Sequence, residues 1–531
     1  MNNSYHFDIN QNKNQTIPLI YKLAKMENAD DKDIQTAFRQ FPKGDNGIFK
    51  KSDLTVSLIE FLKTSQLTLT PHELKTLRQN LKSKEVRSIS GVTPVTVLTK
   101  PFPCPGKCIF CPNDVRMPKS YLSDEPGAQR ATRNRFDPYA QTFNRLVAYK
   151  ALGHSTDKIE LIILGGTWTS YPEPYQIWFV KRCFDAMNDF DTFTLPNPIE
   201  TKMDIPFEDK LLEEVDGTEL NKTYNQIVSM AILPKKSQSE TEHATWDELF
   251  NVHSQNESSE TRCIGLVIET RPDEITETEV IRIRKLGATK VQIGFQSLDD
   301  EVLALNKRGH DSSVTANAVG ILRRAGFKIH AHWMPNLYGS TPEKDIEDYR
   351  KIFSDPRFKP DEIKIYPCSL IASAELMQYY KKGLWKPYTH DELTHVLEEA
   401  YKLTPLYCRI TRMIRDIGSQ DIVVGNKKTN LRQTVEINIK NQKADIQEIR
   451  YREIRGKKVA LEDLKLKVAE YDTSVSTEKF LQFVTNENQI AGFLRLSLPN
   501  QDSPHFIEEL DGAAIIREIH IYGESLNIGE K

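Results

Sequence analysis

The sequence has no apolar run approaching the roughly 18 residues needed to span a bilayer, which argues against a membrane protein. Its first 15 residues lack the basic and apolar regions of a secretory signal, so we expect a cytoplasmic protein. It has only 7 cysteines in 531 residues, and in a reducing compartment we expect these to be thiols. The length exceeds the roughly 250–300 residues that one core supports, so we expect several domains.

The charge is nearly balanced overall but uneven along the chain. Residues 190–262 hold 15 acidic and 6 basic side chains, whereas the whole chain carries a net charge of only −3. The remainder is therefore mildly basic. This permits an anionic partner such as RNA, although solvated surface charge is the simpler explanation.

The hydrophobic pattern changes along the chain and divides it into four parts. Residues 1–85 have apolar spacings of three and four, which predict helices. Residues 86–375 alternate short apolar runs with amphipathic segments, as parallel strands and helices do in an open or closed α/β barrel. The acidic residues 190–243 interrupt this pattern as an insertion. Residues 376–443 predict a helical and basic linker, and residues 444–531 a separate α+β domain. In that domain we interpret three segments as β-like, because they alternate or run apolar over strand lengths: ADIQEIRYREI, QIAGFLRLSLP and AIIREIHIYG. The predicted barrel strands are residues 95–99, 159–164, 263–269, 290–295, 327–332 and 362–367.

The segment PCPGKCIFCP carries Cys104, Cys108 and Cys111 directly after the first predicted strand. Three thiolates on one loop can bind three irons of a 4Fe-4S cluster and leave the fourth iron open to a small ligand. A structural zinc site is the alternative, but it needs four ligands and the chain has no second CxxC. The remaining cysteines stand singly in apolar contexts, where a buried thiol is expected: Cys183, Cys263, Cys368 and Cys408.

The cysteine spacing resembles that of the radical S-adenosylmethionine (SAM) superfamily. The second predicted strand ends in Gly165, Gly166 and Thr167, similar to the glycine motif with which that superfamily contacts SAM. The blocks SISGVTPVTVLTKPFPCPGKCIFCP, GLVIETRPD, KVQIGFQS and HWMPNLYGST further resemble the Elongator catalytic subunit family of tRNA uridine acetyltransferases. REIHIYG, near the end of the chain, is similar to the fourth strand of that family's acetyltransferase domain.

This resemblance implies a fold and a reaction. The fold is α/β, with a partial (β/α)6 radical SAM barrel, a helical N-terminal segment and an incomplete α+β GNAT-type C-terminal domain. The reaction forms 5-carboxymethyluridine at the wobble uridine of tRNA, with a 4Fe-4S cluster and SAM as cofactors and acetyl-CoA as co-substrate. In the family, SAM cleavage gives a radical that takes hydrogen from the acetyl methyl group, and the acetyl radical adds to carbon 5 of uridine. Ordinary acid–base residues cannot place a carbon substituent on that carbon, so the cofactors carry this step.

The resemblance also implies site residues, and strand ends are where parallel barrels place their sites. The cluster ligands are Cys104, Cys108 and Cys111, and the SAM contacts are Gly165, Gly166, Thr167, Glu269, Arg271, Gln296 and Ser297. The acetyl-CoA contacts are Lys158, Glu518, Ile519, His520 and Ile521. For the strand-end residues, a cap or turn role is the alternative.

Two further groups follow from the residues themselves. His330 and His332 alternate with apolar neighbours, so both can face the barrel interior or be satisfied core histidines. Basic residues at near-helical spacing, and others in the linker, are expected to flank the path of tRNA, with solvated faces as the alternative: Lys75, Arg78, Lys82, Lys84, Arg412, Arg415, Lys427 and Lys428.

The sequence also departs from the family. It ends at GESLNIGEK, where relatives continue with a glycine-rich turn that holds the CoA pyrophosphate, so we expect a C-terminally incomplete chain. The missing half arriving on another chain, or a homodimer, stays open. ADIQEIRYREI lacks the cysteines that many relatives carry there, so we predict no zinc. Two other functions remain open: a radical SAM enzyme acting on another substrate, and an inactive truncated tRNA-binding homologue.

Overall fold

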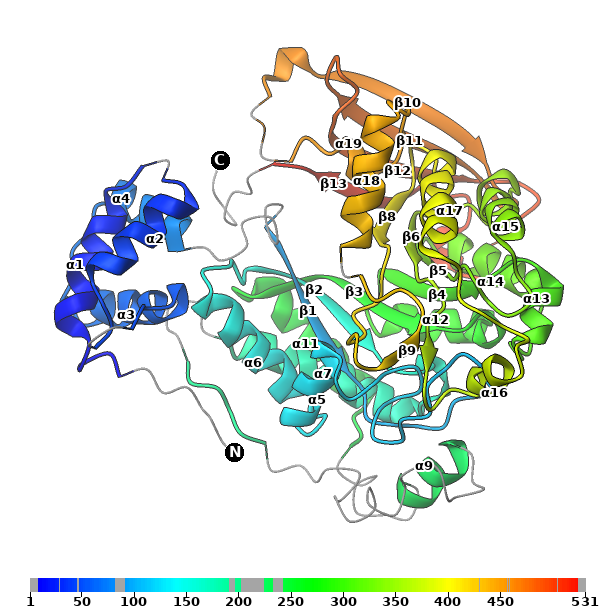
Figure 1. The fold of residues 1–531 in the computed structure, drawn as a ribbon, viewed down its shortest axis with the longest axis horizontal. Coiled ribbons are helices and arrows are strands. Elements are labelled where there is room, and N and C mark those ends of the chain that lie inside the picture. The colour runs from blue at the N-terminus through cyan, green and yellow to red at the C-terminus, as the bar shows by residue number, and fades with distance from the viewer. Residues whose placement is uncertain are drawn as a thin grey trace.

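The computed structural model describes residues 8–27, 29–44, 47–81, 91–190, 196–201, 224–232, 242–428, 430–455, 457, 459–503 and 505–523. Within these ranges, no helix combines the length and apolarity needed to cross a membrane. Figure 1 shows a bundle of helices in blue, a sheet flanked by helices in the middle of the molecule, and a smaller sheet in orange and red near the C-terminus.

The N-terminal part is a bundle of four helices, as the apolar spacing predicted. Its core contains Leu19, Phe38 and Leu77, all nearly fully buried. Asp30 caps the second helix through a reciprocal pair of hydrogen bonds with Asp33. The third helix packs against α6 of the next part. The helices are α1 (Lys13–Ala24), α2 (Asp31–Gln40), α3 (Lys51–Lys63) and α4 (Pro71–Leu81).

The central sheet has seven parallel strands in the order β1-β2-β3-β4-β5-β6-β8. All six strands predicted from short apolar runs are present. The seventh, β8, lies in the segment expected to be a helical and basic linker. Its sequence RITR buries only Ile410, so no apolar run marked it. The strands are β1 (Val92–Leu98), β2 (Lys158–Leu164), β3 (Arg262–Thr270), β4 (Lys290–Gln296), β5 (Lys328–Trp333), β6 (Glu362–Ile365) and β8 (Arg409–Arg412).

Helices cover one face of this sheet, and the other face lines a hollow. On β2, Ile159, Leu161 and Ile163 are buried in the helix-covered core, whereas Glu160 and Ile162 line the hollow. The alternation follows from the pleat, which sends successive side chains to opposite faces. The barrel helices are α5 (Pro126–Arg133), α6 (Pro138–Ala151), α7 (Glu173–Asn188), α11 (Trp246–Ser258), α12 (Glu277–Lys285), α13 (Asp300–Leu305), α14 (Ser312–Arg324), α15 (Pro342–Ser354) and α17 (His390–Leu403).

Smaller elements complete this part of the molecule. The short helix α9 belongs to the acidic segment 190–243, between the second and third strand units, where the insertion was predicted. A two-stranded antiparallel sheet joins β7 to β9. The elements are α9 (Tyr224–Ile232), β7 (Leu370–Ile371), α16 (Leu376–Lys381), β9 (Ile422–Val424) and α18 (Leu431–Asn441).

The C-terminal part is a four-stranded antiparallel sheet in the order β10-β11-β12-β13. The strands predicted at QIAGFLRLSLP and AIIREIHIYG are present as β12 and β13. The β-like interpretation of ADIQEIRYREI is wrong, because it forms the short helix α19 (Ile449–Arg452), which Glu448 caps by accepting from the N–H of Tyr451. The strands are β10 (Lys465–Asp472), β11 (Ser476–Val484), β12 (Ile490–Pro499) and β13 (Ile515–Ile521).

Buried ion pairs join this second sheet to the barrel. Arg517 of β13 donates to both carboxylate oxygens of Asp361, at 2.6 and 2.8 Å, and also pairs with Glu478 of β11. Asp361 precedes β6, so the contact fixes β13 against the amino end of the barrel strands. Several apolar side chains of the small sheet are exposed: Leu466, Val468, Phe483, Ile516, Ile519 and Ile521.

Candidate active site

The three motif cysteines lie on the loop after β1, at the carboxyl end of the parallel sheet. Cys104 Sγ lies 3.4 Å from the hydroxyl of Thr167, and Cys111 Sγ lies 3.3 Å from the hydroxyl of Ser120. Cys104 and Cys108 are buried, and Cys111 is half-buried. The loop therefore turns its thiols toward neighbouring polar side chains.

Cys108 has a strongly positive surrounding. Arg308 and Arg271 donate to its sulfur at 3.5 and 3.7 Å. A hydrogen bond from Cys111, together with these two guanidinium charges, lowers the pKa of the Cys108 thiol well below its ordinary value, although burial opposes the change. The same hydrogen bond and burial raise the pKa of Cys111. Since the thiolate is the form that binds metal, this environment favours ligation by Cys108.

The donor set fits an iron–sulfur cluster. Among the described residues, no group of three His, Cys, Asp or Glu side chains is placed to hold a metal ion. In a 4Fe-4S cluster each thiolate binds a different iron, so the ligands do not need to meet at one point. Three thiols spaced along one loop can each bind a different iron in this way. The two guanidinium groups beside Cys108 balance the negative charge of the thiolates.

Gly165, Gly166 and Thr167 follow β2 and lie beside the cysteine loop. A Cβ atom on Gly165 would lie 1.9 Å from the hydroxyl of Thr99, which no real side chain tolerates. Gly165 therefore allows the loops after β1 and β2 to approach each other closely. Thr167 then places its hydroxyl against Cys104.

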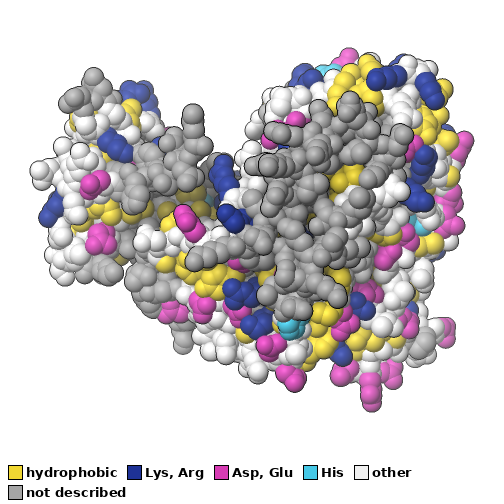
Figure 2. All heavy atoms as spheres, turned by 90° about the horizontal axis from the view of Figure 1, so that it is seen from below, with side chains coloured by type: hydrophobic (Ala, Val, Ile, Leu, Met, Phe, Trp, Pro, Cys, Tyr) yellow, Lys and Arg dark blue, Asp and Glu magenta, His cyan; other side chains and the backbone are white. Residues whose placement is uncertain are grey.

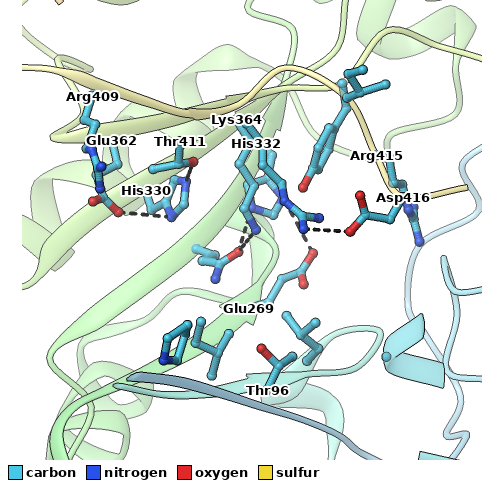
Figure 3. A pocket seen from close by; sticks show the side chains of 18 of the residues that line it. Thr96, Glu269, His330, His332, Glu362, Lys364, Arg409, Thr411, Arg415 and Asp416 are labelled. Carbon is cyan, nitrogen blue, oxygen red and sulfur yellow. Dashed lines mark hydrogen bonds and ion pairs between the residues drawn. The ribbon is translucent and has the colours of Figure 1, made fainter. Parts of the chain in front are cut away.

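Polar side chains from neighbouring strands meet on the hollow face of the sheet (Figure 3). His332 of β5 lies with Nε2 2.9 Å from Gln292 Oε1 and with Nδ1 3.6 Å from Glu269 Oε1. Lys364 also donates to Gln292 Oε1, and Tyr121 donates to Glu269 Oε2 at 2.7 Å. Burial lowers the pKa of His332 well below its ordinary value, so its imidazole is neutral near pH 7.

His330 lies two residues earlier on the same face. Its Nε2 is 2.9 Å from the hydroxyl of Thr411, and its Nδ1 is 3.4 Å from Glu362 Oε2. Glu362 is also paired with Lys290 at 3.2 Å and with Lys328 at 2.8 Å. Burial lowers the pKa of His330 well below its ordinary value. Both histidines thus line the hollow, as their alternation in the sequence indicated.

One cavity of about 2040 Å³ runs along this face. Cys111 and Gln296 line it where the parallel strands end, and Glu518, Ile519 and His520 of β13 also line it. Lys328, the first residue of β5, pairs with Glu518 at 2.5 Å, so β13 meets the cavity at the amino end of the strands. β5 has 6 residues and runs along the cavity from one end to the other. Because an extended chain rises about 3.3 Å per residue, the two ends of the cavity lie roughly 20 Å apart.

Comparisons with known proteins agree with this architecture. Residues 244–352 match the radical SAM superfamily, and residues 360–441 match its C-terminal domain. The cysteine loop lies outside both matched ranges. The chain is 36% identical over 449 residues to the tRNA uridine(34) acetyltransferase of Dehalococcoides mccartyi (strain CBDB1), a match that covers 84% of this chain and 86% of that protein. The chain belongs to the tRNA uridine(34) acetyltransferase family.

Two further relatives support the assignment. Elongator complex protein 3 of Homo sapiens is 29% identical over 482 residues, covering 87% of this chain and 77% of the human protein. The solved structure of the archaeal Methanocaldococcus infernus Elp3 with an N-terminal deletion is similar at a TM-score of 0.63 and 33% identity, covering 82% of this chain and 84% of that chain. The predicted α/β fold with a partial radical SAM barrel and the resemblance to the Elongator catalytic subunit family are therefore confirmed.

In this member of the tRNA uridine(34) acetyltransferase family, the SAM contacts expected at strand ends divide into two groups. Glu269 and Gln296 line the cavity. Arg271 and Ser297 are buried beside it, where Arg271 pairs with Asp273 and Cys108, and Ser297 donates to Asp348 at 3.2 Å. Arg271 thus stabilises the cysteine loop, and Ser297 stabilises the end of β4.

The residues expected to contact acetyl-CoA are also divided. Glu518 and His520 line the cavity, but the carboxylate of Glu518 is already paired with Lys328 and with Arg495 at 2.7 Å. Ile519 lines the cavity with a largely exposed side chain, and Ile521 is 75% exposed. Lys158 begins β2 and is not among the cavity-lining residues of the described chain.

The linker residues expected to contact tRNA line the same cavity: Arg412, Arg415, Lys427 and Lys428. Lys427 and Lys428 are exposed, and Arg412 pairs with Asp416 at 2.7 Å. Arg415 is more enclosed and pairs with Glu125 at 2.8 Å. Of the N-terminal candidates, Lys75 and Arg78 belong to α4, and Lys82 and Lys84 lie outside the described residues. Figure 2 shows Lys and Arg side chains near the notch between the helical bundle and the body of the molecule.

Sequence reasoning missed several polar residues of the site. Arg308 follows α13 in an ordinary KRGHD stretch, and nothing local indicates that it reaches Cys108. Lys364 and Gln292 lie within strands that are otherwise largely apolar. Because side chains alternate between the two faces of a strand, a polar residue in such a strand could have been recognised as a candidate for the hollow face. Tyr121 lies in a loop. The four single cysteines are buried or half-buried, and burial raises the pKa of Cys263 and Cys368 to about 12.

Proposed function

We propose that this chain forms 5-carboxymethyluridine at the wobble uridine of tRNA, with SAM as cofactor and acetyl-CoA as the carbon source. The observation that carries the proposal is that one cavity of about 2040 Å³ is lined both by Cys111 and by Glu518, Ile519 and His520. One continuous space lets chemistry at the cysteine loop act on an acyl group delivered from β13. The family membership supplies the substrate class.

Cys104, Cys108 and Cys111 would hold the 4Fe-4S cluster. When bound, that cluster supplies the electron for reductive cleavage of SAM. Gly166 and Thr167, beside Cys104, are suited to the methionine end of SAM. Glu269 and Gln296 line the adjoining wall of the cavity and can accept from or donate to the rest of that ligand.

The polar groups on the hollow face suit a nucleobase. Lys364 donates to Gln292 Oε1, and His332 Nε2 lies 2.9 Å from the same oxygen, where an N–H on that nitrogen can donate to it. A neutral imidazole, a lysine and a carboxylate together offer donors and acceptors at fixed positions. Such an array orients a flat ring and holds it away from bulk water.

Acetyl-CoA fits the β13 end of the cavity. β13 is the last strand in its sheet, so one side of its backbone is not paired within the described residues. Backbone N–H and C=O groups on that side can bind a linear amide-containing arm as a further strand would. The roughly 20 Å to the cysteine loop requires an extended ligand, which a thioester on a long arm provides.

The test is SAM cleavage by the anaerobically reduced protein, with and without tRNA and acetyl-CoA, in the cytoplasmic pH range expected for this enzyme. We expect cleavage that rises when both substrates are added and that is lost in Cys104→Ala. Cleavage without any response to tRNA would favour a radical SAM enzyme with another substrate. Tight tRNA binding with no cleavage would favour an inactive homologue.

A further inference from the structure

The acidic segment 190–243 contacts the cysteine loop through its described helix α9. The side-chain amide of Asn225 makes two hydrogen bonds to the backbone of Cys104. Its Oδ1 accepts from the Cys104 N–H at 3.0 Å, and its Nδ2 donates to the Cys104 carbonyl at 2.7 Å. A neighbouring strand makes the same pair of contacts in an antiparallel sheet. The first motif cysteine is therefore held from outside its own loop.

Tyr224, the residue before Asn225, contacts the part of the loop that follows the third cysteine. The hydroxyl of Tyr224 donates to the carbonyl of Met117 at 2.7 Å, and the ring lies 4.8 Å from the ammonium of Lys119. Tyr224 is only 5% exposed, so it is packed into this contact. α9 thus joins the first motif cysteine to the segment that follows the third. Figure 1 shows α9 in green at the lower edge of the molecule, toward which β1 runs.

The end of the acidic segment returns to the start of the loop. Glu242 pairs with Lys100, the second residue after β1, and both side chains are buried. Lys100 also lies 5.1 Å from the ring centroid of Tyr175. Leaving either charge buried without its partner is costly, so this pair fixes the end of the segment. Two separate parts of the segment therefore attach to the same loop.

We propose that α9 and Glu242, two described parts of the acidic segment, form a clamp on the cysteine loop, with Asn225 as the positioning residue that fixes the backbone of Cys104. The clamp deepens the proposed function and rests on it for the presence of the cluster. The sulfur of Cys108 accepts from two guanidinium groups, whereas the sulfur of Cys104 contacts the hydroxyl of Thr167. Its position therefore depends more on the two backbone hydrogen bonds that Asn225 makes.

Three variants separate the contributions. Asn225→Ala removes both hydrogen bonds. Asn225→Asp keeps an acceptor for the Cys104 N–H but places a second acceptor against the Cys104 carbonyl. Asn251→Asp is the matched control, because Asn251 is an exposed asparagine on α11.

The first measurement needs no cluster. The 531-residue chain, freed of iron by a chelator under anaerobic conditions, is alkylated with iodoacetamide, and the modified peptides are quantified by mass spectrometry. Trypsin cleavage after Lys107 separates Cys104 from Cys108. We expect alkylation of Cys104 to be about tenfold faster in Asn225→Ala, with a smaller increase in Asn225→Asp and none in Asn251→Asp. The rate at the buried Cys183 should stay unchanged.

The second measurement uses the reconstituted protein and follows iron release to a coloured chelator, together with the midpoint potential of the cluster. Faster release and a shifted potential in Asn225→Ala support the clamp, whether or not tRNA is modified. Wild-type rates of alkylation and release in Asn225→Ala would overturn it. Equal acceleration at Cys104 and Cys183 would also overturn it, because that result means general loosening of the fold.

Discussion

The guanidinium of Arg308 lies 3.5 Å from the sulfur of Cys108 while it donates to the carbonyl of Gly294 at 2.7 Å. It joins the carboxyl end of β4 to the cysteine loop. Removing its charge takes away one of the causes that lower the pKa of Cys108, so the thiolate becomes less favoured. In iron-free Arg308→Gln, we expect the pH profile for alkylation of Cys108 to move to higher pH.

Peptide-resolved mass spectrometry across a pH series measures that profile. Arg350→Gln provides the control, since Arg350 is an exposed arginine on α15 that pairs with Glu347. An unchanged profile in Arg308→Gln would mean that the hydrogen bond from Cys111 and the charge of Arg271 suffice without Arg308.

The two classes of cysteine should respond differently to substitution. Three ligands leave no redundancy, so Cys104→Ala, Cys108→Ala or Cys111→Ala should abolish both the visible absorbance of the cluster and SAM cleavage. The single cysteines serve packing, and their alanine variants should keep both properties: Cys183, Cys263, Cys368 and Cys408. Full iron content in a triple loop variant would show that the cluster site is elsewhere.

The buried carboxylate of Asp361 should be important for stability. It has no exposed surface and pairs with Arg517 and Arg495, whose charges hold its pKa well below the ordinary value against the cost of burial. Asp361→Asn leaves these guanidinium groups buried without a full countercharge, so we expect a loss of about 3–5 kcal/mol in the free energy of unfolding. Glu347→Gln, in an exposed pair, should change it by less than about 0.5 kcal/mol.

Urea unfolding at several pH values measures this loss in the free energy of unfolding and the direction in which it depends on pH. A carboxylate with a depressed pKa stabilises the fold at every pH above its unfolded value of about 3.9, and the contribution is lost only below that. The difference between wild type and Asp361→Asn should therefore be constant between pH 7 and pH 5. A difference that disappears in this interval would contradict the assigned charge state.

The exposed lysines at the cavity rim should contribute to tRNA affinity through phosphate contacts. Replacing Lys427 and Lys428 with alanine should weaken binding and make the log–log salt slope less negative by roughly 1.4–1.8, if each contacts one phosphate. Alanine substitution of Lys381 and Lys382, an exposed pair that does not line the cavity, serves as the control. Filter binding across a salt series measures both slopes, and identical slopes would exclude Lys427 and Lys428 from the RNA path.

Much of the fold follows from short-range patterns in the sequence. Six barrel strands appear as apolar runs, because parallel strands bury many of their residues. β8 does not, since only Ile410 is buried in it and the rest of RITR is polar. The β-like interpretation of ADIQEIRYREI is wrong because a local cap from Glu448 outweighed its strand pattern. Neither a short strand with one buried side chain nor a helix cap produces a hydrophobic periodicity in the sequence.

Candidate site residues could be proposed from the sequence where the chemistry is local, and not where it depends on long-range contacts. Cys104, Cys108 and Cys111 follow one another on one loop, so spacing alone indicates their role. Arg308 is 200 residues from Cys108 along the chain, and Asn225 is 121 residues from Cys104. Only the folded arrangement brings such pairs together.

In the proposed function, one cavity carries an acetyl-derived carbon unit from the β13 end to a tRNA base near the cysteine loop. The most direct measurement is transfer of isotope from acetyl-CoA labelled at both acetyl carbons, with SAM, a reductant and tRNA, followed by mass spectrometry of the digested nucleosides. We predict 5-carboxymethyluridine containing both labelled carbons, with none formed by Cys108→Ala. Efficient SAM cleavage under these conditions without label in tRNA would contradict the claim.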